Sequence, residues 1–577
     1  MKEFKKNIKR TWIYTKDQKK ELFLYMFMHL IDIVIGIVLP IISAKIIIYL
    51  TKNNYYQIAL MALIIFFIES TRNLIYYGER KTTQIIYRET FNKIQVNLGK
   101  EILKLENKVL DEKGTGVFIQ RINGDTEKLS DIFNDLGFYL SEILKNIGIF
   151  IAIFIINKTC FIYLLISSFI IFLVDKKRVK IRKENKNKVK KKEEISTGFV
   201  NEMIRGARDI KMLNGENSFI NELDKKIKDT SNEKYYLNKI DRMWTFFTGE
   251  LRDIGDLGLI ILLILLLKEN ILTGAFALVI YNYSSYISYI TMDVSYLLDL
   301  TTDFNVSATR VYNILDSKEF DKEVFGKKHL DKIKGNFEFK NVSFAYNENN
   351  SNKVLDNISF KIKSRETIAF VGKSGAGKTT IFNLLCKMYP KYKGKITIDG
   401  IDIKELDKDS IRGNITIISQ NPYIFNVSIK DNLRLVKEDV TDEEIYEACR
   451  LACLNDFIDS LENKYDTIIG EGGITLSGGQ KQRLAIARAL VQKTEIILFD
   501  EATSALDNET QEQIQRAIEN MRSNFTILII AHRLSTIINS DRILFLNNGK
   551  IEAEGTHKEL LKKCPEYKQL YEAEIEK

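Results

Sequence analysis

Residues 366–380 read ETIAFVGKSGAGKTT, an apolar run that leads directly into a glycine-rich loop. The loop matches the pattern GxxxxGK followed by Ser or Thr, and it lies between a predicted strand ending at Val371 and a predicted helix beginning near Thr379. Glycines let backbone N–H groups converge on phosphate oxygens, and the helix N-terminus adds partial positive charge. We therefore expect Lys378 to reach the β- and γ-phosphates of a nucleotide and the Thr379 hydroxyl to bind Mg²⁺.

A pair of acidic residues follows another apolar run. Residues 496–500 read IILFD and predict a buried strand, which Glu501 follows directly. Asp500 at the strand end can hold Mg²⁺, directly or through water, and Glu501 can polarise an attacking water. Acids after a strand are common, so the inference depends on their combination with the glycine loop. Together the two segments predict hydrolysis of a nucleotide.

A second glycine motif opens a predicted helix. Residues 476–480 read LSGGQ and precede KQRLAIARALVQK. A serine and two glycines at a helix N-terminus can form a second anion site. Spacing alone favours the simpler interpretation, a plain glycine turn with a capping serine.

The first half of the chain contains six long apolar stretches. A bilayer core about 30 Å thick needs about twenty apolar residues per helix. The stretches cover about 22–50, 56–77, 133–157, 159–175, 246–267 and 272–300, of which the third and the sixth are the most polar. The net charge of +9 would be compatible with nucleic acid, but basic residues cluster beside apolar runs, before residue 20 and between 175 and 192. This pattern indicates a lipid bilayer and no nucleic-acid partner, although a solvated face explains any single cluster as well.

The links between the stretches predict the topology. Three links are short and carry little positive charge, whereas the two others are long, basic and rich in helix formers. The positive-inside rule then places both termini in the cytoplasm, with long helical extensions on that side of a cell membrane. The basic start, with interleaved apolar residues, predicts an amphipathic helix on the inner surface.

The second half changes to short strands that alternate with helices. This pattern predicts an α/β domain with a largely parallel sheet. The expected fold is therefore a membrane protein, with a six-helix transmembrane domain followed by an α/β P-loop ATPase domain. The expected parts are an interfacial helix at 1–20, the six-span domain at 21–315, a linker at 316–335 and the nucleotide-binding domain at 336–577.

The motifs of the second half, in this order, resemble the nucleotide-binding domain of ATP-binding-cassette (ABC) transporters, over roughly residues 336–577. LSGGQ is the signature motif of that family. The first half resembles the exporter-type membrane domain, with expected coupling helices near 106–114 and 213–221, so the chain resembles an exporter-type half-transporter. In the coupling loop formed by Gly470, Glu471 and Gly473, Gly472 stands where many relatives carry Arg, which puts that loop's contact in doubt.

The resemblance implies roles for individual residues. Tyr346 would stack on adenine, Gln420 would contact Mg²⁺, and His532 would sense the γ-phosphate. The expected catalytic residues are Glu501, His532, Lys378 and Gln420, and the expected metal ligands are Thr379, Gln420 and Asp500. The expected ATP-binding residues are Tyr346, Gly372, Ser374, Gly375, Gly377, Lys378, Thr379, Thr380, Ser477, Gly478, Gly479, Gln480 and Asp507.

The family mechanism implies ATP and Mg²⁺ as cofactors and a second half-transporter as partner. Two ATPase domains would close over two ATP molecules and drive export of an amphipathic small molecule, peptide or lipid. Because all the site residues occur in this chain, a homodimer is favoured over a heterodimer. The expected membrane is that of a bacterial cell. An importer with exporter architecture and an ATP-gated signalling or channel protein are the alternatives.

The sixth apolar stretch carries a polar arc. At 100° per residue its polar members lie within about 140° of one another, and apolar residues occupy the opposite side. Two readings remain: the arc lines a substrate path, or it forms hydrogen bonds between helices. Under the first reading, the same cavity would include His29 and Asp32 of the first stretch and Asp253 and Asp256 of the fifth. The arc consists of Tyr281, Asn282, Ser285, Tyr286, Tyr289, Asp293 and Tyr296.

Overall fold

The structure is a computed structural model that describes residues 2–113, 115–346, 353–437, 439–470, 473–500, 508–522, 524–530 and 537–575. The chain divides into two compact units. The helical unit contains Met1–Leu103 and Gly114–Glu319, and the α/β unit contains Lys104–Lys113 and Phe320–Lys577.

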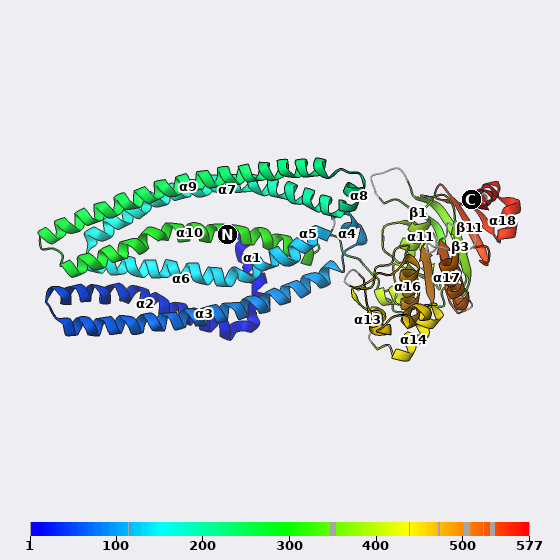
Figure 1. The fold of residues 1–577 in the computed structure, drawn as a ribbon, viewed down its shortest axis with the longest axis horizontal. Helices are drawn as coiled ribbons and strands as arrows, with labels where there is room; N and C mark the ends of the chain where they lie inside the picture. The colour runs from blue at the N-terminus through cyan, green and yellow to red at the C-terminus, as the bar shows by residue number, and fades with distance from the viewer. Residues whose placement is uncertain are drawn as a thin grey trace. The chain divides into compact units, whose positions relative to one another are not determined.

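The helical unit consists mainly of long helices that pair along their lengths (Figure 1). α2 packs on α3, α6 on α10, and α7 on α9. The helices are α1 (Lys2–Thr15), η1 (Lys16–Gln18), α2 (Lys19–Thr51), α3 (Tyr55–Ile102), α5 (Thr115–Gln120), the π-helical turn η2 (Arg121–Asp125), α6 (Thr126–Ile156), α7 (Lys158–Arg205), α8 (Ala207–Met212), α9 (Glu216–Lys268) and α10 (Gly274–Leu315).

Asparagine residues shape two short links of the helical unit. Asn54 caps α3 by accepting a hydrogen bond from the backbone N–H of Gln57 at 3.2 Å. Asn157 caps α7 in the same way, from Cys160 at 3.0 Å. These caps satisfy backbone donors that a helix leaves unpaired at its start, so each chain reversal needs few residues.

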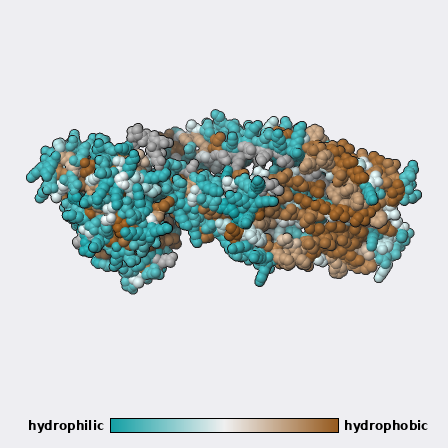
Figure 2. All heavy atoms as spheres, turned by 180° about the vertical axis from the view of Figure 1, so that it is seen from behind, coloured by the Kyte–Doolittle hydropathy of each residue, from teal (hydrophilic) through white to brown (hydrophobic). Residues whose placement is uncertain are grey.

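Many large apolar side chains of the helical unit are exposed. Phe23, Phe67 and Ile155 are examples, and Figure 2 shows a broad hydrophobic belt on the face that it presents. Such a large apolar surface is typical of contact with lipid. Among the described residues, four stretches are long and apolar enough to cross a membrane: Lys2–Thr51, Tyr55–Ile102, Gly116–Ile156 and Lys158–Arg182. The fifth and sixth predicted spans, in α9 and α10, stay predictions.

The N-terminal helix α1 packs against the end of α10. Arg10 forms an ion pair with Asp316 at 2.6 Å and lies over the ring of Tyr312 at 3.8 Å. The hydroxyl of Tyr312 also shares a hydrogen bond with Thr11 at 2.7 Å. The buried face of α1 is therefore polar, which the amphipathic pattern did not predict.

Two short helices lie where the long helices are interrupted. α4 (Asn107–Lys113) matches the range expected for the first coupling helix and belongs to the α/β unit. The second short helix is α8, which lies on the N-terminal side of the range 213–221 expected for it. The difference arises because Asn214, with a φ of 51°, and Gly215 lead directly into α9.

The α/β unit contains a six-stranded sheet in the order β12-β11-β3-β10-β9-β6. The five strands from β11 to β6 run parallel, and β12 pairs antiparallel at one edge. A separate antiparallel sheet has the order β2-β1-β4-β5, and β7 pairs with β8. Successive residues of β3 face two different cores: Ala369 and Val371 belong to one, and Ile368 and Phe370 to the other. A strand buried on both faces is apolar throughout, as residues 367–371 are.

Helices cover the sheet on both sides. α11 contributes Ile381 and Phe382 to the core that the antiparallel sheet shares, and α16 contributes Leu484 and Ile486 to the other core. The strands are β1 (Phe337–Phe344), β2 (Leu355–Ile362), β3 (Thr367–Val371), β4 (Lys393–Ile398), β5 (Ile401–Asp402), β6 (Ile415–Ile418), β7 (Val427–Ser428), β8 (Ile468–Ile469), β9 (Ile496–Asp500), β10 (Thr526–Ile530), β11 (Arg542–Asn547) and β12 (Lys550–Gly555). The helices are α11 (Lys378–Leu385), α12 (Lys408–Arg412), α13 (Ile429–Arg434), α14 (Asp442–Leu451), α15 (Asn455–Asp459), η3 (Lys464–Asp466), α16 (Gly478–Gln492), α17 (Asn508–Met521), α18 (His557–Lys563) and α19 (Pro565–Ile575).

Candidate nucleotide-binding site

The glycine loop connects the buried strand β3 to α11. Gly377 has a φ of 99°, and a Cβ there would lie 2.6 Å from the side chain of Leu355. A Cβ on Gly372 would lie 2.1 Å from the carbonyl oxygen of Leu546. Both positions therefore require glycine, because any side chain would push the loop away from its neighbours. Ser374 and Gly375, in the middle of the loop, are exposed.

Lys378 is held close to this loop. Its side chain is buried, and Nζ donates to the carbonyl oxygens of Gly372 at 2.8 Å and Lys373 at 3.1 Å. Burying an ammonium group costs free energy unless it is hydrogen-bonded, so these contacts hold the charge at the loop. The charge thus lies at the N-terminus of α11, where phosphates bind favourably.

The hydroxyl of Thr379 connects the loop to β9. It donates a hydrogen bond to Oδ1 of Asp500 at 3.2 Å. A hydroxyl and a carboxylate are oxygen ligands of the kind that Mg²⁺ prefers. The predicted metal ligands Thr379 and Asp500 are therefore brought together, and their chemistry fits Mg²⁺.

β3, β6, β9 and β10 form the parallel part of the sheet, so their carboxyl ends lie at the same side of it. β6, β9 and β10 are neighbours in the sheet, and β3 lies beside β10. Gln420 follows β6, and its carbonyl oxygen accepts a hydrogen bond from the Gln482 side chain at 3.3 Å. The predicted catalytic residues Glu501 and His532 follow the ends of β9 and β10 in the sequence. Both lie outside the described residues, as does the predicted ATP-binding residue Asp507.

Tyr346 lies beside the loop in an aromatic group. Its ring packs edge-on against Phe344 and Tyr389, at 5.0 and 5.1 Å between centroids, and its hydroxyl shares a hydrogen bond with Thr380 at 3.0 Å. Burial raises the pKa of the Tyr389 hydroxyl above its usual range. Tyr346 is 42% exposed, which leaves part of its ring surface free to contact a base. The sequence analysis did not identify Tyr389, because only the fold brings it to Tyr346.

Ser477 begins α16 with a reciprocal cap. Its hydroxyl accepts from the backbone N–H of Gln480 at 3.3 Å, and the Gln480 side chain accepts from the N–H of Ser477 at 2.9 Å. The capping serine that spacing alone predicts is thus confirmed. Ser477 and Gly478 are exposed and Gly479 is buried, so the start of α16 remains accessible for an anion. Gly470 precedes this region with a φ of 111°, while Glu471 and Gly472 lie outside the described residues.

Comparison with known protein families matches both units. The model described as ABC transporter matches residues 355–504, and the model described as ABC transporter transmembrane region matches residues 22–251. The chain is 38% identical over 367 residues to ABC transporter B family member 1 of Dictyostelium discoideum, covering 62% of this chain and 40% of that protein. It is 44% identical over 265 residues to the ATP-dependent lipid A-core flippase of Desulfotalea psychrophila, covering 46% of each. The chain thus spans less than half of these relatives.

The fold is similar to that of a bacterial Atm1-family ABC exporter solved with ATP bound. The TM-score is 0.84 with 22% sequence identity, covering 96% of this chain and 99% of that chain. This likeness shows a shared fold, including a helical transmembrane domain followed by an ABC nucleotide-binding domain. The chain therefore belongs to the ABC transporter family, with its transmembrane region and its ATP-binding domain fused in one polypeptide.

Proposed function

We propose that this chain is half of an exporter that couples ATP hydrolysis to movement of a substrate across a membrane. The observation that carries the proposal is the hydrogen bond between Thr379 and Asp500 beside the loop-bound Lys378. These residues lie in the same polypeptide as long helices with a large exposed apolar surface. A phosphate site fused to a membrane domain is the arrangement that such coupling requires.

The residues divide the chemistry between them. Lys378 and the loop N–H groups bind the phosphates, and Tyr346 stacks on the base. Thr379, Asp500 and Gln420 would hold Mg²⁺, which would supply positive charge beside the phosphates. Glu501 accepts a proton from the attacking water, and His532 contacts the γ-phosphate. The roles of Glu501, His532 and Asp507 rest on the sequence motifs alone.

The working unit is a dimer. The exposed start of α16, with Ser477, Gly478 and Gly479, meets the γ-phosphate of ATP bound to the glycine loop of the second chain, so ATP joins the two halves. ADP lacks this phosphate and holds them less well. A homodimer is favoured because one chain supplies every motif, and a heterodimer is the alternative.

Export is the direction that the relatives favour. Their names include a lipid A-core flippase and a β-(1→2)glucan export protein. We accordingly assign this chain to export of an amphipathic small molecule, peptide or lipid across a bacterial cell membrane, with both termini in the cytoplasm. An importer with the same architecture or an ATP-gated channel finds no support in these names.

The test uses inside-out vesicles that contain the full chain, with ATP added to the outside. We expect ATP-dependent uptake of at least one labelled cargo from a panel of amines, peptides and lipids. Lys378→Ala should abolish uptake at equal protein levels. ATP hydrolysis that opens a conductance without concentrating any cargo would instead identify a channel and contradict the proposal.

A further inference from the structure

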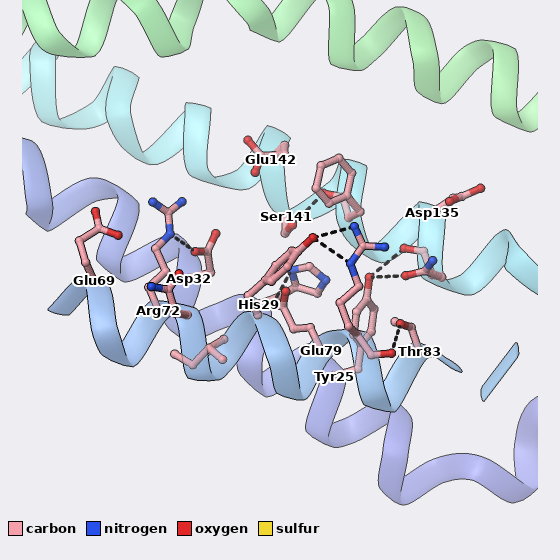
Figure 3. Close-up of a pocket in the computed structure, with 16 residues that line it drawn as sticks. Tyr25, His29, Asp32, Glu69, Arg72, Glu79, Thr83, Asp135, Ser141 and Glu142 are labelled. Atoms are coloured by element: carbon pink, nitrogen blue, oxygen red, sulfur yellow. Dashed lines mark hydrogen bonds and ion pairs between the residues drawn. The ribbon is translucent and has the colours of Figure 1, made fainter. Parts of the chain in front are cut away.

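A polar cavity of about 510 Å³ lies between α2, α3 and α6 (Figure 3). We call it the acidic pocket. α2 contributes Tyr25 to Asp32, α3 contributes Glu69 to Thr83, and α6 contributes Asn134 to Glu142. Its volume is within the range of small-molecule sites, about 300–1,000 Å³. At 1.5 Å per residue, the lining of α3 extends over ~21 Å.

The lining of the acidic pocket has an excess of negative charge. Five carboxylates face two guanidinium groups, those of Arg72 and Arg80. The carboxylates are Asp32, Glu69, Glu79, Asp135 and Glu142. Charged groups within membrane helices are costly unless they are paired, and they commonly mark a binding site or pathway.

Internal partners account for only part of this charge. Arg72 pairs with Asp32 at 2.8 Å, and the neighbouring Lys145 pairs with Glu142 at 2.5 Å. Glu69 and Asp135 form no ion pair with any residue that the structure describes. A positively charged occupant would therefore find carboxylates that are not already neutralised.

His29 provides a second, independent sign of a ligand. The residue is only 8% exposed, lines the acidic pocket and lies 3.4 Å from Glu79 through Nδ1. Its Nε2 is buried and has no hydrogen-bond partner among the described residues. A buried polar atom without a partner costs about 1–3 kcal/mol, and a ligand in this pocket can supply the missing partner.

The arrangement suits an organic cation better than a metal ion. Within the described ranges, no three His, Cys, Asp or Glu side chains converge closely enough to hold a metal. Glu69 and Glu79 lie ten residues apart on α3, or ~15 Å along the helix. A single compact charge cannot reach both ends, whereas a chain with several ammonium groups can.

We propose that the acidic pocket binds a hydrophilic organic cation that carries two or more ammonium groups. Carboxylates along the pocket contact the separate ammonium groups, and Nε2 of His29 accepts a hydrogen bond from one of them. This proposal names the substrate class for the proposed exporter and rests on that function only for what happens after binding.

The experiment measures spermidine binding to the full chain in phosphatidylcholine nanodiscs by isothermal titration calorimetry. No ATP is added, and these lipids lack primary amines, so the bilayer supplies no ammonium group that could donate a hydrogen bond in place of the probe. We expect saturable binding of spermidine and none of 1,8-octanediol, a neutral molecule of extended shape. Mg²⁺ at equal ionic strength should not displace spermidine. Displacement would show that the pocket attracts any cation without specificity, and it would overturn the proposal.

Variants locate the binding within the pocket. Glu69→Gln combined with Asp135→Asn should weaken spermidine binding at least tenfold, because it removes two negative charges without leaving a cationic partner unpaired. His29→Phe keeps an aromatic ring beside Tyr25, 4.3 Å away, and should weaken binding severalfold. The control for total charge is Glu222→Gln with Asp224→Asn on α9, whose carboxylates pair with Lys226 and Lys228. It removes the same charge outside the pocket and should bind spermidine as the original chain does.

The outcomes separate this inference from the exporter function. Two results overturn the proposal that the acidic pocket binds an organic cation. One is equal weakening of spermidine binding in the pocket and control variants, and the other is no spermidine binding by a chain that still moves other cargo. Binding with the expected variant pattern but without ATP-driven movement of any cargo supports the pocket and contradicts the exporter function. If the double variant does not fold, Glu69→Gln and Asp135→Asn are measured singly, with about threefold weakening expected from each.

Discussion

Tyr346 illustrates how the fold adds to the role that a motif assigns. The sequence predicts a ring that stacks on adenine, and the structure surrounds this ring with Phe344 and Tyr389 and joins its hydroxyl to Thr380 at 3.0 Å. The hydroxyl therefore fixes the ring beside α11, while the exposed ring surface remains for the base. Stacking and positioning should be separable by mutation.

Tyr346→Ala should raise the apparent KM for ATP about tenfold or more with a smaller effect on kcat, because stacking of a base on an aromatic ring contributes about 1–3 kcal/mol. Tyr346→Phe keeps the ring and should change KM less than about twofold. It loses the hydrogen bond to Thr380, which is worth about 0.5–1.5 kcal/mol of stability. Steady-state ATPase kinetics and thermal unfolding of both variants test this, and an equal loss of folded protein in both would indicate a packing role only.

At the scale of elements, the N-terminus of α16 contributes both to the stability of the fold and to the proposed binding of ATP. Ser477 and Gln480 cap the helix reciprocally, while the exposure of Ser477 and Gly478 leaves the helix end open. The proposed dimer needs the second property, and the fold of a single chain needs the first. A substitution that keeps the cap but changes the charge separates them.

Ser477→Ala should lower the free energy of unfolding by about 1 kcal/mol, because the cap is lost. Ser477→Asp keeps a capping oxygen and should retain stability, yet its carboxylate repels the phosphates of ATP and should reduce ATPase activity at least tenfold. Thermal unfolding and ATPase rates are compared in both. A fully active, stable Ser477→Asp protein would show that this helix end does not face ATP.

The sequence predicts best those elements whose pattern depends only on residues close together in the chain. The apolar strands β3, β9 and β10, each followed by a site residue or loop, are found as expected side by side in the parallel part of one sheet, in the order β3-β10-β9. The antiparallel sheet that contains β1 and β2 was not distinguished, because strand pairing is not local. α9 and α10 lie outside the four membrane candidates among the described residues, since Arg252 and Asp253 in α9 and the tyrosines and serines of α10 dilute their apolar character.

The polar arc of α10 likewise shows that a local pattern does not predict which side chains become buried. Tyr281 and Tyr296 are exposed, whereas Tyr283, outside the predicted arc, is fully buried and donates to the carbonyl oxygen of Ile37 at 2.5 Å. The side chains at 285 and 289 lie outside the described residues, so the lining of a substrate path by this arc stays a prediction. The acidic pocket is lined by α2, α3 and α6. Of its lining residues the sequence analysis singled out His29 and Asp32, as additions to the cavity of the arc, and missed the other carboxylates because their convergence depends on how these three helices pack.

At the scale of the whole molecule, the proposed dimer makes each ATP site depend on both chains. One chain supplies Lys378 and the other supplies Ser477. A mixed dimer of Lys378→Ala and Ser477→Asp chains would therefore combine both defects in one site and leave the other site intact. Two independent sites within single chains would not behave in this way.

Co-expression of the two variants, each with its own affinity tag, should restore ATPase activity to tandem-purified mixed dimers, while each variant alone stays inactive. The restored activity should be a substantial fraction of the original, about half if the sites work independently. Mixed dimers as inactive as the separate variants would contradict the sharing of sites between two copies of this chain.

The central claim is that the membrane-embedded chain hydrolyses ATP with Glu501 as the base. The most direct measurement is the Mg²⁺-dependent ATPase rate of the purified chain in nanodiscs beside Glu501→Gln, with ATP binding measured on the same samples. Glutamine keeps the shape of the side chain and loses its basicity, so we predict retained ATP binding and a rate at least about 10²-fold lower. Near-normal turnover by Glu501→Gln would contradict the account.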